Sequence, residues 1–104
     1  MQFVYIFLRT DRFDRWLAAL ADQTAKARIL ARIRSAMLGN LGDCKAVGEG
    51  VSEMRVHVGP GYRIFFGRTG DAVYILLAGG DKSTQKKDIA LAKALFRDFK
   101  EIKQ

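Results

Sequence analysis

The chain has 104 residues, of which 49% are hydrophobic, so it is long and apolar enough for one domain with a modest core and is not a disordered segment. Eighteen Lys and Arg residues against eleven Asp and Glu residues give a formal charge of +7, which is typical of proteins that meet nucleic acid, an acidic protein or an anionic membrane. The single cysteine excludes an internal disulfide and favours a reducing compartment.

The first predicted element is a β-strand over residues 2–9, which contains the run FVYIFL. This run is too short to span a bilayer, and it lacks the basic lead and the small-residue cleavage site of a signal peptide. We therefore expect a buried strand in a cytoplasmic protein that does not bind membranes.

Two helices are predicted to follow and to form a hairpin joined near Asp22. Thr10 or Asp11 is suited to cap the first helix, and residues 23–38 form the second. Gly39 comes directly after the last apolar residue, where a left-handed C-cap is expected. Apolar residues at helical spacing predict the inward faces: Phe13, Trp16, Leu17 and Leu20 in the first helix, and Ile29, Leu30, Ile33 and Met37 in the second.

The second half of the chain is predicted to be mostly β-structure. The glycine-rich segment GNLGDCKAVGEG, residues 39–50, is expected to be a loop. The run AVYILLA, residues 72–78, is apolar almost throughout, which predicts a central strand covered on both faces. Turns at GPG and TGD separate the three strands that we expect over residues 51–58, 62–68 and 72–78.

A last helix is expected near the C-terminus, and either Ser83 or Thr84 is suited to cap it. Its predicted inward residues are Ile89, Ala92, Leu95, Phe96 and Phe99. The order β-α-α-β-β-β-α predicts an α+β fold, in which an N-terminal strand, a helical hairpin and a C-terminal helix pack on a small, mostly antiparallel sheet. Because no repeat or linker divides the chain, residues 1–104 are expected to form a single domain.

The stretch EMRVHVGPGYRIFF, residues 53–66, carries the first candidate site. Alternation along a strand places Glu53, Arg55 and His57 on one face. Whether Arg63 of the next strand joins them depends on the register, which the sequence leaves open. One interpretation is a solvated face on which Glu53 pairs with an arginine. The other is an anion site, in which the arginines bind phosphate through paired hydrogen bonds and His57 transfers a proton.

Two further segments present positive charge. In GGDKSTQ, residues 79–85, Lys82 precedes a predicted helix N-terminus, and the alternatives are an anion-binding loop or a plain strand-to-helix turn. Tyr62 is suited either to pack at its strand end or to stack on a base. The second helix contains no acid, so its cations form either a solvated face or a surface for nucleic-acid phosphates. These cations are Lys26, Arg28, Arg32 and Arg34.

The sequence contains no recognisable motif for binding a metal or a cofactor. One cysteine and one histidine are too few for a zinc site, and the spacing of a phosphate-binding loop is missing. Cys44 lies in the predicted loop without a histidine near it in sequence, which argues against a nucleophile. We therefore expect no metal and no cofactor.

Several motifs together resemble one group of proteins. They are EMR at 53–55, GPGYRIFF at 59–66, LLAGGDKSTQKKDIALAKAL at 76–95 and LGNLGDCKAVGEGVSEMR at 38–55. In this order and at this spacing they resemble the RelE/ParE superfamily of toxins, and within it the HigB-like addiction module killer branch of type II toxin–antitoxin systems. The similarity covers nearly the whole chain, and the expected element order is also that of the superfamily.

The resemblance implies a toxin whose partners are a cognate antitoxin of helix-turn-helix type and the ribosome with its mRNA. RelE- and HigB-like members cut mRNA in the ribosomal A site, so the first hypothesis is a ribosome-dependent mRNA endoribonuclease. ParE-like members inhibit DNA gyrase on the same scaffold, which is the second hypothesis. Several cleaving relatives carry a Tyr or His near the C-terminus, and residues 83–104 contain neither. The third hypothesis is a non-catalytic basic binding module or an inactivated toxin.

For an mRNA-cleaving toxin, the resemblance also implies roles for the charged residues. Arg63 falls on the strand arginine of the family and would clamp the scissile phosphate. Arg55 would be a second phosphate contact, and Lys82 would reach the same place from the loop after the central strand. Glu53 or His57 would transfer a proton, unless Glu53 only orients Arg55.

Overall fold

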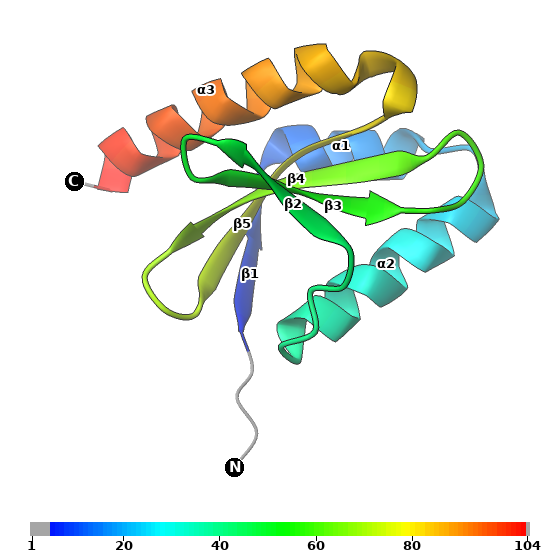
Figure 1. The fold of residues 1–104 in the computed structure, drawn as a ribbon, viewed down its shortest axis with the longest axis horizontal. Helices are drawn as coiled ribbons and strands as arrows, with labels where there is room; N and C mark the ends of the chain where they lie inside the picture. Colours follow the sequence, from blue (N-terminus) through cyan, green and yellow to red (C-terminus); the bar gives the residue numbers. More distant parts are fainter. Residues whose placement is uncertain (1–4, 104) are drawn as a thin grey trace.

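The computed structural model describes residues 5–103, which form an open five-stranded sheet with helices on both of its faces (Figure 1). The elements in chain order are β1 (Ile6–Arg9), α1 (Asp11–Ala19), α2 (Gln23–Met37), β2 (Cys44–Gly48), β3 (Val51–Val56), β4 (Tyr62–Thr69), β5 (Val73–Asp81), a 3₁₀ turn (Lys82–Thr84) and α3 (Gln85–Lys103). The predicted α+β class is confirmed. Residues 2–4 of the first predicted strand lie outside the described residues, and β1 itself is mostly exposed, so the expectation of a buried strand is wrong for Ile6–Arg9.

The strands follow the spatial order β1-β5-β4-β3-β2. β1 runs parallel to β5, and all other neighbours are antiparallel, so the sheet is mixed but mostly antiparallel, as expected. β4 rather than β5 lies in the middle of the order. β5 is nevertheless an interior strand, and its side chains from Tyr74 to Ala78 are buried on both faces, which explains its apolar run.

Two hydrophobic cores lie on opposite faces of the sheet, and Figure 1 shows α3 and α2 on opposite sides of it. The first core joins α1 and α2 to the strands through Phe13, Leu17, Ile29, Ile33, Ala36, Met54, Val56, Ile64, Phe66, Tyr74 and Leu76. The second joins α3 to the sheet through Val51, Phe65, Ile75, Leu77, Ala92 and Phe96. The expected inward stripes are confirmed except at Leu30, which is 37% exposed. The alternation of strand side chains therefore assigns each residue to one helical layer.

Local polar contacts begin the helices. The Thr10 hydroxyl accepts a hydrogen bond from the backbone N–H of Phe13, and the Asp22 carboxylate accepts one from Ala25. Gly39 has a φ of +97°, which confirms the left-handed end predicted for α2. The last helix differs from the prediction, because Asp81 rather than Ser83 or Thr84 caps its leading 3₁₀ turn. None of the helices in residues 5–103 combines the length and apolar character that a membrane span requires.

The predicted loop over residues 39–50 is wrong in its second half, which forms the edge strand β2. This strand pairs with β3 on one side only, and most of its residues are exposed, so it lacks the apolar alternation of a half-buried strand. A tight turn connects the two strands. Its residues Glu49 and Gly50 both have positive φ, +54° and +80°, as a twisted two-residue hairpin requires. The element order is therefore β-α-α-β-β-β-β-α.

The predicted strand-to-helix turn at residues 79–85 also begins later than expected, because β5 continues through Gly79 and Gly80 to Asp81. Neither glycine has space for a side chain. A Cβ on Gly79 would lie 2.2 Å from the Trp16 ring of α1, and one on Gly80 would lie 1.9 Å from the carboxylate of Asp88 in α3. The two glycines therefore let the helices approach the strand from both faces.

Candidate functional site

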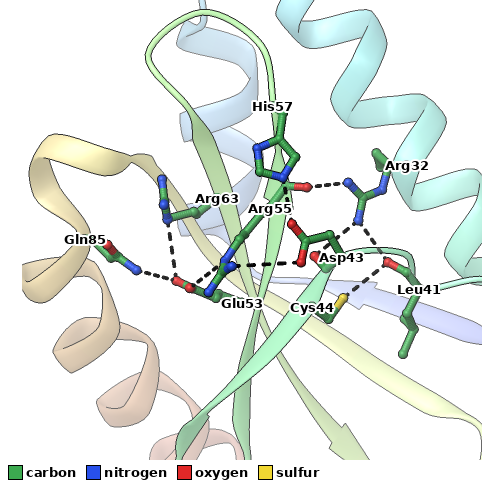
Figure 2. A network of polar contacts seen from close by, with 9 residues as sticks. All are labelled: Arg32, Leu41, Asp43, Cys44, Glu53, Arg55, His57, Arg63 and Gln85. Carbon is green, nitrogen blue, oxygen red and sulfur yellow. Dashed lines mark hydrogen bonds and ion pairs between the residues drawn. The ribbon is translucent and has the colours of Figure 1, made fainter.

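The register between β3 and β4 answers the question that the sequence left open. Arg55 and Arg63 are direct partners across the two strands, so both side chains lie on the face of Glu53. Figure 2 shows these three side chains converging from the two neighbouring strands. This face is covered by α3 over the rest of its length, and it is open only near the turn between β3 and β4.

Glu53 is the central acid of this group, and it is not solvated. Its side chain is 1% exposed, and its carboxylate accepts hydrogen bonds from Gln85 Nε2 at 2.8 Å and from Arg55 Nε at 3.2 Å. The Nε of Arg63 lies 3.7 Å from the same carboxylate. A buried carboxylate needs compensating charge, and here two guanidinium groups supply it. Glu53 is therefore placed to orient both arginines rather than to meet a ligand in solvent.

A cavity of about 440 Å³ opens beside the two arginines. Its walls are the turn at residues 59–61, the exposed Lys82 after β5, and the side of His57. Arg63 donates from Nη1 to the carbonyl oxygen of Gly61 at 2.9 Å, which holds the guanidinium against the turn. Its buried Nε has no hydrogen-bond partner among the described residues. Two arginines and a lysine thus border one solvent-open hollow, the cationic cavity, an arrangement that suits an anion.

His57 has a partner that sequence spacing did not indicate. Its Nε2 lies 2.7 Å from Oδ2 of Asp43, and because the carboxylate can only accept, the ring nitrogen donates (Figure 2). This hydrogen bond, assisted by the charge of Arg55, holds the pKa of Asp43 below its usual 3.8. Asp43 Oδ1 also lies 4.0 Å from Arg55 Nη1. One exposed carboxylate therefore orients both an imidazole and a guanidinium at the cavity rim.

Arg32 of α2 is half-buried and fastens this region through three backbone carbonyls. It donates from Nη1 to the carbonyl oxygen of Arg55, and from Nη2 to those of Leu41 and Asp43 at 2.9 and 3.5 Å. These contacts fasten the segment before β2 to β3 and so position Asp43. Burial raises the pKa of the neighbouring Cys44 thiol, whose Sγ donates to Leu41 O at 3.2 Å, so this thiol is suited to packing rather than to nucleophilic attack.

The other predicted RNA-binding residues lie apart from this cavity. Lys26 is half-buried, and Arg28 and Arg34 are exposed, on α2, which covers the opposite face of the sheet. Tyr62 also points to that face, where its ring meets Trp16 edge to face with centroids 6.3 Å apart, yet it borders the cavity as well. The structure thus gathers Glu53, Arg55, His57, Arg63 and Lys82 and leaves Lys26, Arg28 and Arg34 elsewhere.

Sequence reasoning missed two members of the polar network, Asp43 and Gln85. Asp43 is 14 positions before His57, and Gln85 is 32 positions after Glu53. Asp43 lies in a segment predicted to be a loop, and Gln85 is the residue at which α3 begins. Neither position has a local pattern that would have indicated the contact, because both contacts depend on how distant segments pack.

Comparison with known proteins places the chain in a family. The family model of the phage-derived protein Gp49-like matches residues 15–97, which is more than half of the chain. The chain belongs to the Gp49-like family. The match covers the second half of α1, all of α2 and of β2 to β5, and most of α3. Every residue that lines the cationic cavity therefore lies within the matched region.

A relative in Haemophilus influenzae, described as an uncharacterized protein, is 48% identical over 90 residues, which cover 86% of this chain and 91% of the relative. The Gp49-like family is associated with toxin–antitoxin modules, and membership in it suggests an antitoxin as a partner. The expectation that the protein belongs to a toxin–antitoxin module thus agrees with the family. The reaction and its target are matters for the site itself.

Proposed function

We propose that this Gp49-like protein is the toxin of a type II toxin–antitoxin module and acts as a ribosome-dependent mRNA endoribonuclease of the RelE/ParE superfamily. The observation that carries the proposal is the cavity bordered by Arg55, Arg63 and Lys82, in which a buried carboxylate orients the two arginines. An RNA phosphate is an anion of the right size and charge for such a group. The +7 charge favours approach to ribosomal RNA.

RNA cleavage through the 2′-hydroxyl requires three contributions. A base must take the hydroxyl proton, cations must stabilise the charge that develops on the phosphate, and an acid must protonate the leaving 5′-oxygen. Arg63 and Arg55 are placed for the second task, and Lys82 reaches the same hollow from the end of β5. His57 supplies the imidazole on this rim, the side chain that most often transfers protons in catalysis, and Asp43 orients its ring. In this proposal Glu53 positions the arginines and does not transfer protons.

A second candidate function is inhibition of DNA gyrase, as in ParE-like proteins. It is favoured by one observation, that residues 83–104 contain neither tyrosine nor histidine. The cleaving relatives that the sequence resembles often use such a residue near the C-terminus. A basic module that binds its antitoxin without catalysis is the remaining alternative.

The test is cleavage of a defined mRNA on purified ribosomes. We expect the wild-type protein to cut the transcript and Arg63→Ala to cut it at least about 100-fold more slowly, since removing one preorganised charge donor has effects of this size. Arg63→Lys keeps the charge but not the paired geometry, so it should also be slow. Arg97→Ala, an exposed arginine that pairs with Glu49 on the far end of the sheet, is the matched control and should cut normally.

Separate measurements check that the variants are folded and test the alternative targets. Thermal melts show whether each variant is folded at the assay temperature. If wild type and Arg63→Ala leave the transcript equally intact, the nuclease proposal is refuted, and a fall in supercoiling on adding the protein to gyrase would establish the second candidate instead. If neither assay responds while the protein still binds its antitoxin, the non-catalytic alternative holds.

A further inference from the structure

A second cavity, of about 540 Å³, shares Tyr62 with the cationic cavity. It is formed where α1, the end of β5 and the start of α3 meet. The function proposed above makes no use of this cavity. Its lining combines cations, two aromatic rings and strand backbone, which is a combination found where single-stranded nucleotides bind.

The floor of this cavity is the free edge of β5. β1 pairs with β5 only as far as Leu76, where Thr10 ends the ladder by donating to the carbonyl oxygens of Leu76 and Leu77. Within the described part of the chain, no strand pairs with that edge over residues 78–81, and these residues line the cavity. Strand backbone that lacks a pairing strand can hydrogen-bond to the polar edge of a ligand.

Two aromatic rings form one wall. Trp16 lies against Gly79 so closely that a Cβ on this glycine would be 2.2 Å from the indole. Tyr62 stands at 64° to the indole plane with 6.3 Å between the ring centroids. Both rings are only half-buried and line the cavity. A flat group can therefore rest on one ring while the other closes the side.

The charges at the rim are of two kinds. Arg12, Arg15 and Lys87 are exposed, and among the described residues none of the three has a hydrogen bond or ion pair to another side chain. Asp81 and Asp88 are already engaged, since Asp81 accepts from the Ser83 backbone and Asp88 from the Thr84 hydroxyl. Three cations and two carboxylates therefore border the cavity, and the formal charge of its lining is positive.

We propose that this cavity is a nucleotide subsite. It rests on the proposed function, because Tyr62 borders both cavities and would place the bound nucleotide next to the one whose phosphate lies between Arg55 and Arg63. The phosphate meets Arg12, Arg15 and Lys87, and the base rests against Trp16 and Tyr62. A peptide of acidic residues fits less well, because it lacks the flat ring that Trp16 and Tyr62 are placed to contact.

The test uses the fluorescence of Trp16, which is the only tryptophan in the chain. The probe is a single-stranded RNA hexanucleotide that carries 2′-O-methyl groups and so resists cleavage. At fixed ionic strength it should quench the indole emission of the full-length protein in a saturable way. Arg12→Ala and Arg15→Ala should each weaken this binding by roughly fivefold, the upper range for one exposed charge contact. Arg97→Ala, remote from the cavity, should bind as wild type does.

Each outcome decides the proposal. Wild-type emission that the hexanucleotide leaves unchanged, or equal affinities for wild type, Arg12→Ala and Arg15→Ala, would overturn it. Tighter quenching by a decapeptide of glutamates than by the RNA would overturn it in favour of a peptide groove. Binding is measured without ribosomes, so a protein that fails the cleavage assay but shows the expected quenching refutes only the proposed function. A protein that cleaves mRNA while Trp16 does not respond refutes only the subsite.

Discussion

Replacing Glu53 by alanine should destabilise the fold far more than the same change at Glu49. The Glu53 side chain is 1% exposed, and its carboxylate holds Arg55, Arg63 and Gln85. Its removal leaves Arg63 without its acidic partner, leaves Arg55 with only the distant carboxylate of Asp43 at 4.0 Å, and takes the acceptor away from Gln85. Glu49 is also paired with cations, Arg97 at 2.7 Å and Lys93 at 3.9 Å, but it is 51% exposed.

The magnitude follows from the burial of the partners. Breaking a buried ion pair by removing one member costs about 3–5 kcal/mol. The side chains of Arg55 and Arg63 keep 31% and 14% exposure, so water recovers part of the loss. We therefore expect the lower end, about 3 kcal/mol of unfolding free energy, which lowers the melting temperature of a domain of this size by roughly 12–24 °C. At Glu49 the expected loss is about 0–1 kcal/mol.

Urea denaturation followed by circular dichroism measures both losses. Glu53→Gln is a useful third variant, because it keeps the volume and one acceptor oxygen but removes the charge, and it should fall between wild type and Glu53→Ala. If Glu53→Ala and Glu49→Ala differ by less than about 1 kcal/mol, the buried carboxylate does not hold the two arginines as argued.

Three further predictions concern the surroundings of the site. The hydrogen bond from His57 lowers the pKa of Asp43 in the folded protein. The stability that wild type has over Asp43→Asn should therefore be present above pH 3.8 and be lost as the pH falls through the folded-state pKa of Asp43. A stability difference between the two proteins that is equal at about pH 7 and about pH 2 would contradict this. Arg32→Ala should lower the free energy of unfolding by about 2 kcal/mol, because three carbonyl oxygens lose their donor. The matched change at the exposed Arg34 should cost less than about 0.5 kcal/mol. Similar losses for the two variants in urea denaturation would show that Arg32 does not anchor the segment before β2. Gly79→Ala should cost about 1–3 kcal/mol by displacing the indole ring, and an unchanged melting temperature with unchanged indole emission would argue against this packing.

The sequence by itself determined the helices, the interior strands and the class of the fold. Their signals are local: apolar residues at helical spacing, cap residues such as Thr10 and the glycine turns between strands. It also indicated that Arg55, Arg63 and Lys82 are the cations to consider near an anion. Periodicity can do this because the geometry of one helix or strand fixes which of its own residues share a face.

Only the tertiary structure decided the edge strand β2, the partner of each charge and the burial of Glu53. An edge strand has one neighbour and exposes most of its side chains, so its sequence carries little apolar pattern. The pairing of Arg55 with Arg63 depends on register, and the contacts from Glu53 to Gln85 and from His57 to Asp43 depend on where α3 and the segment before β2 pack. These are relations between distant segments, and a pattern within one segment does not encode them.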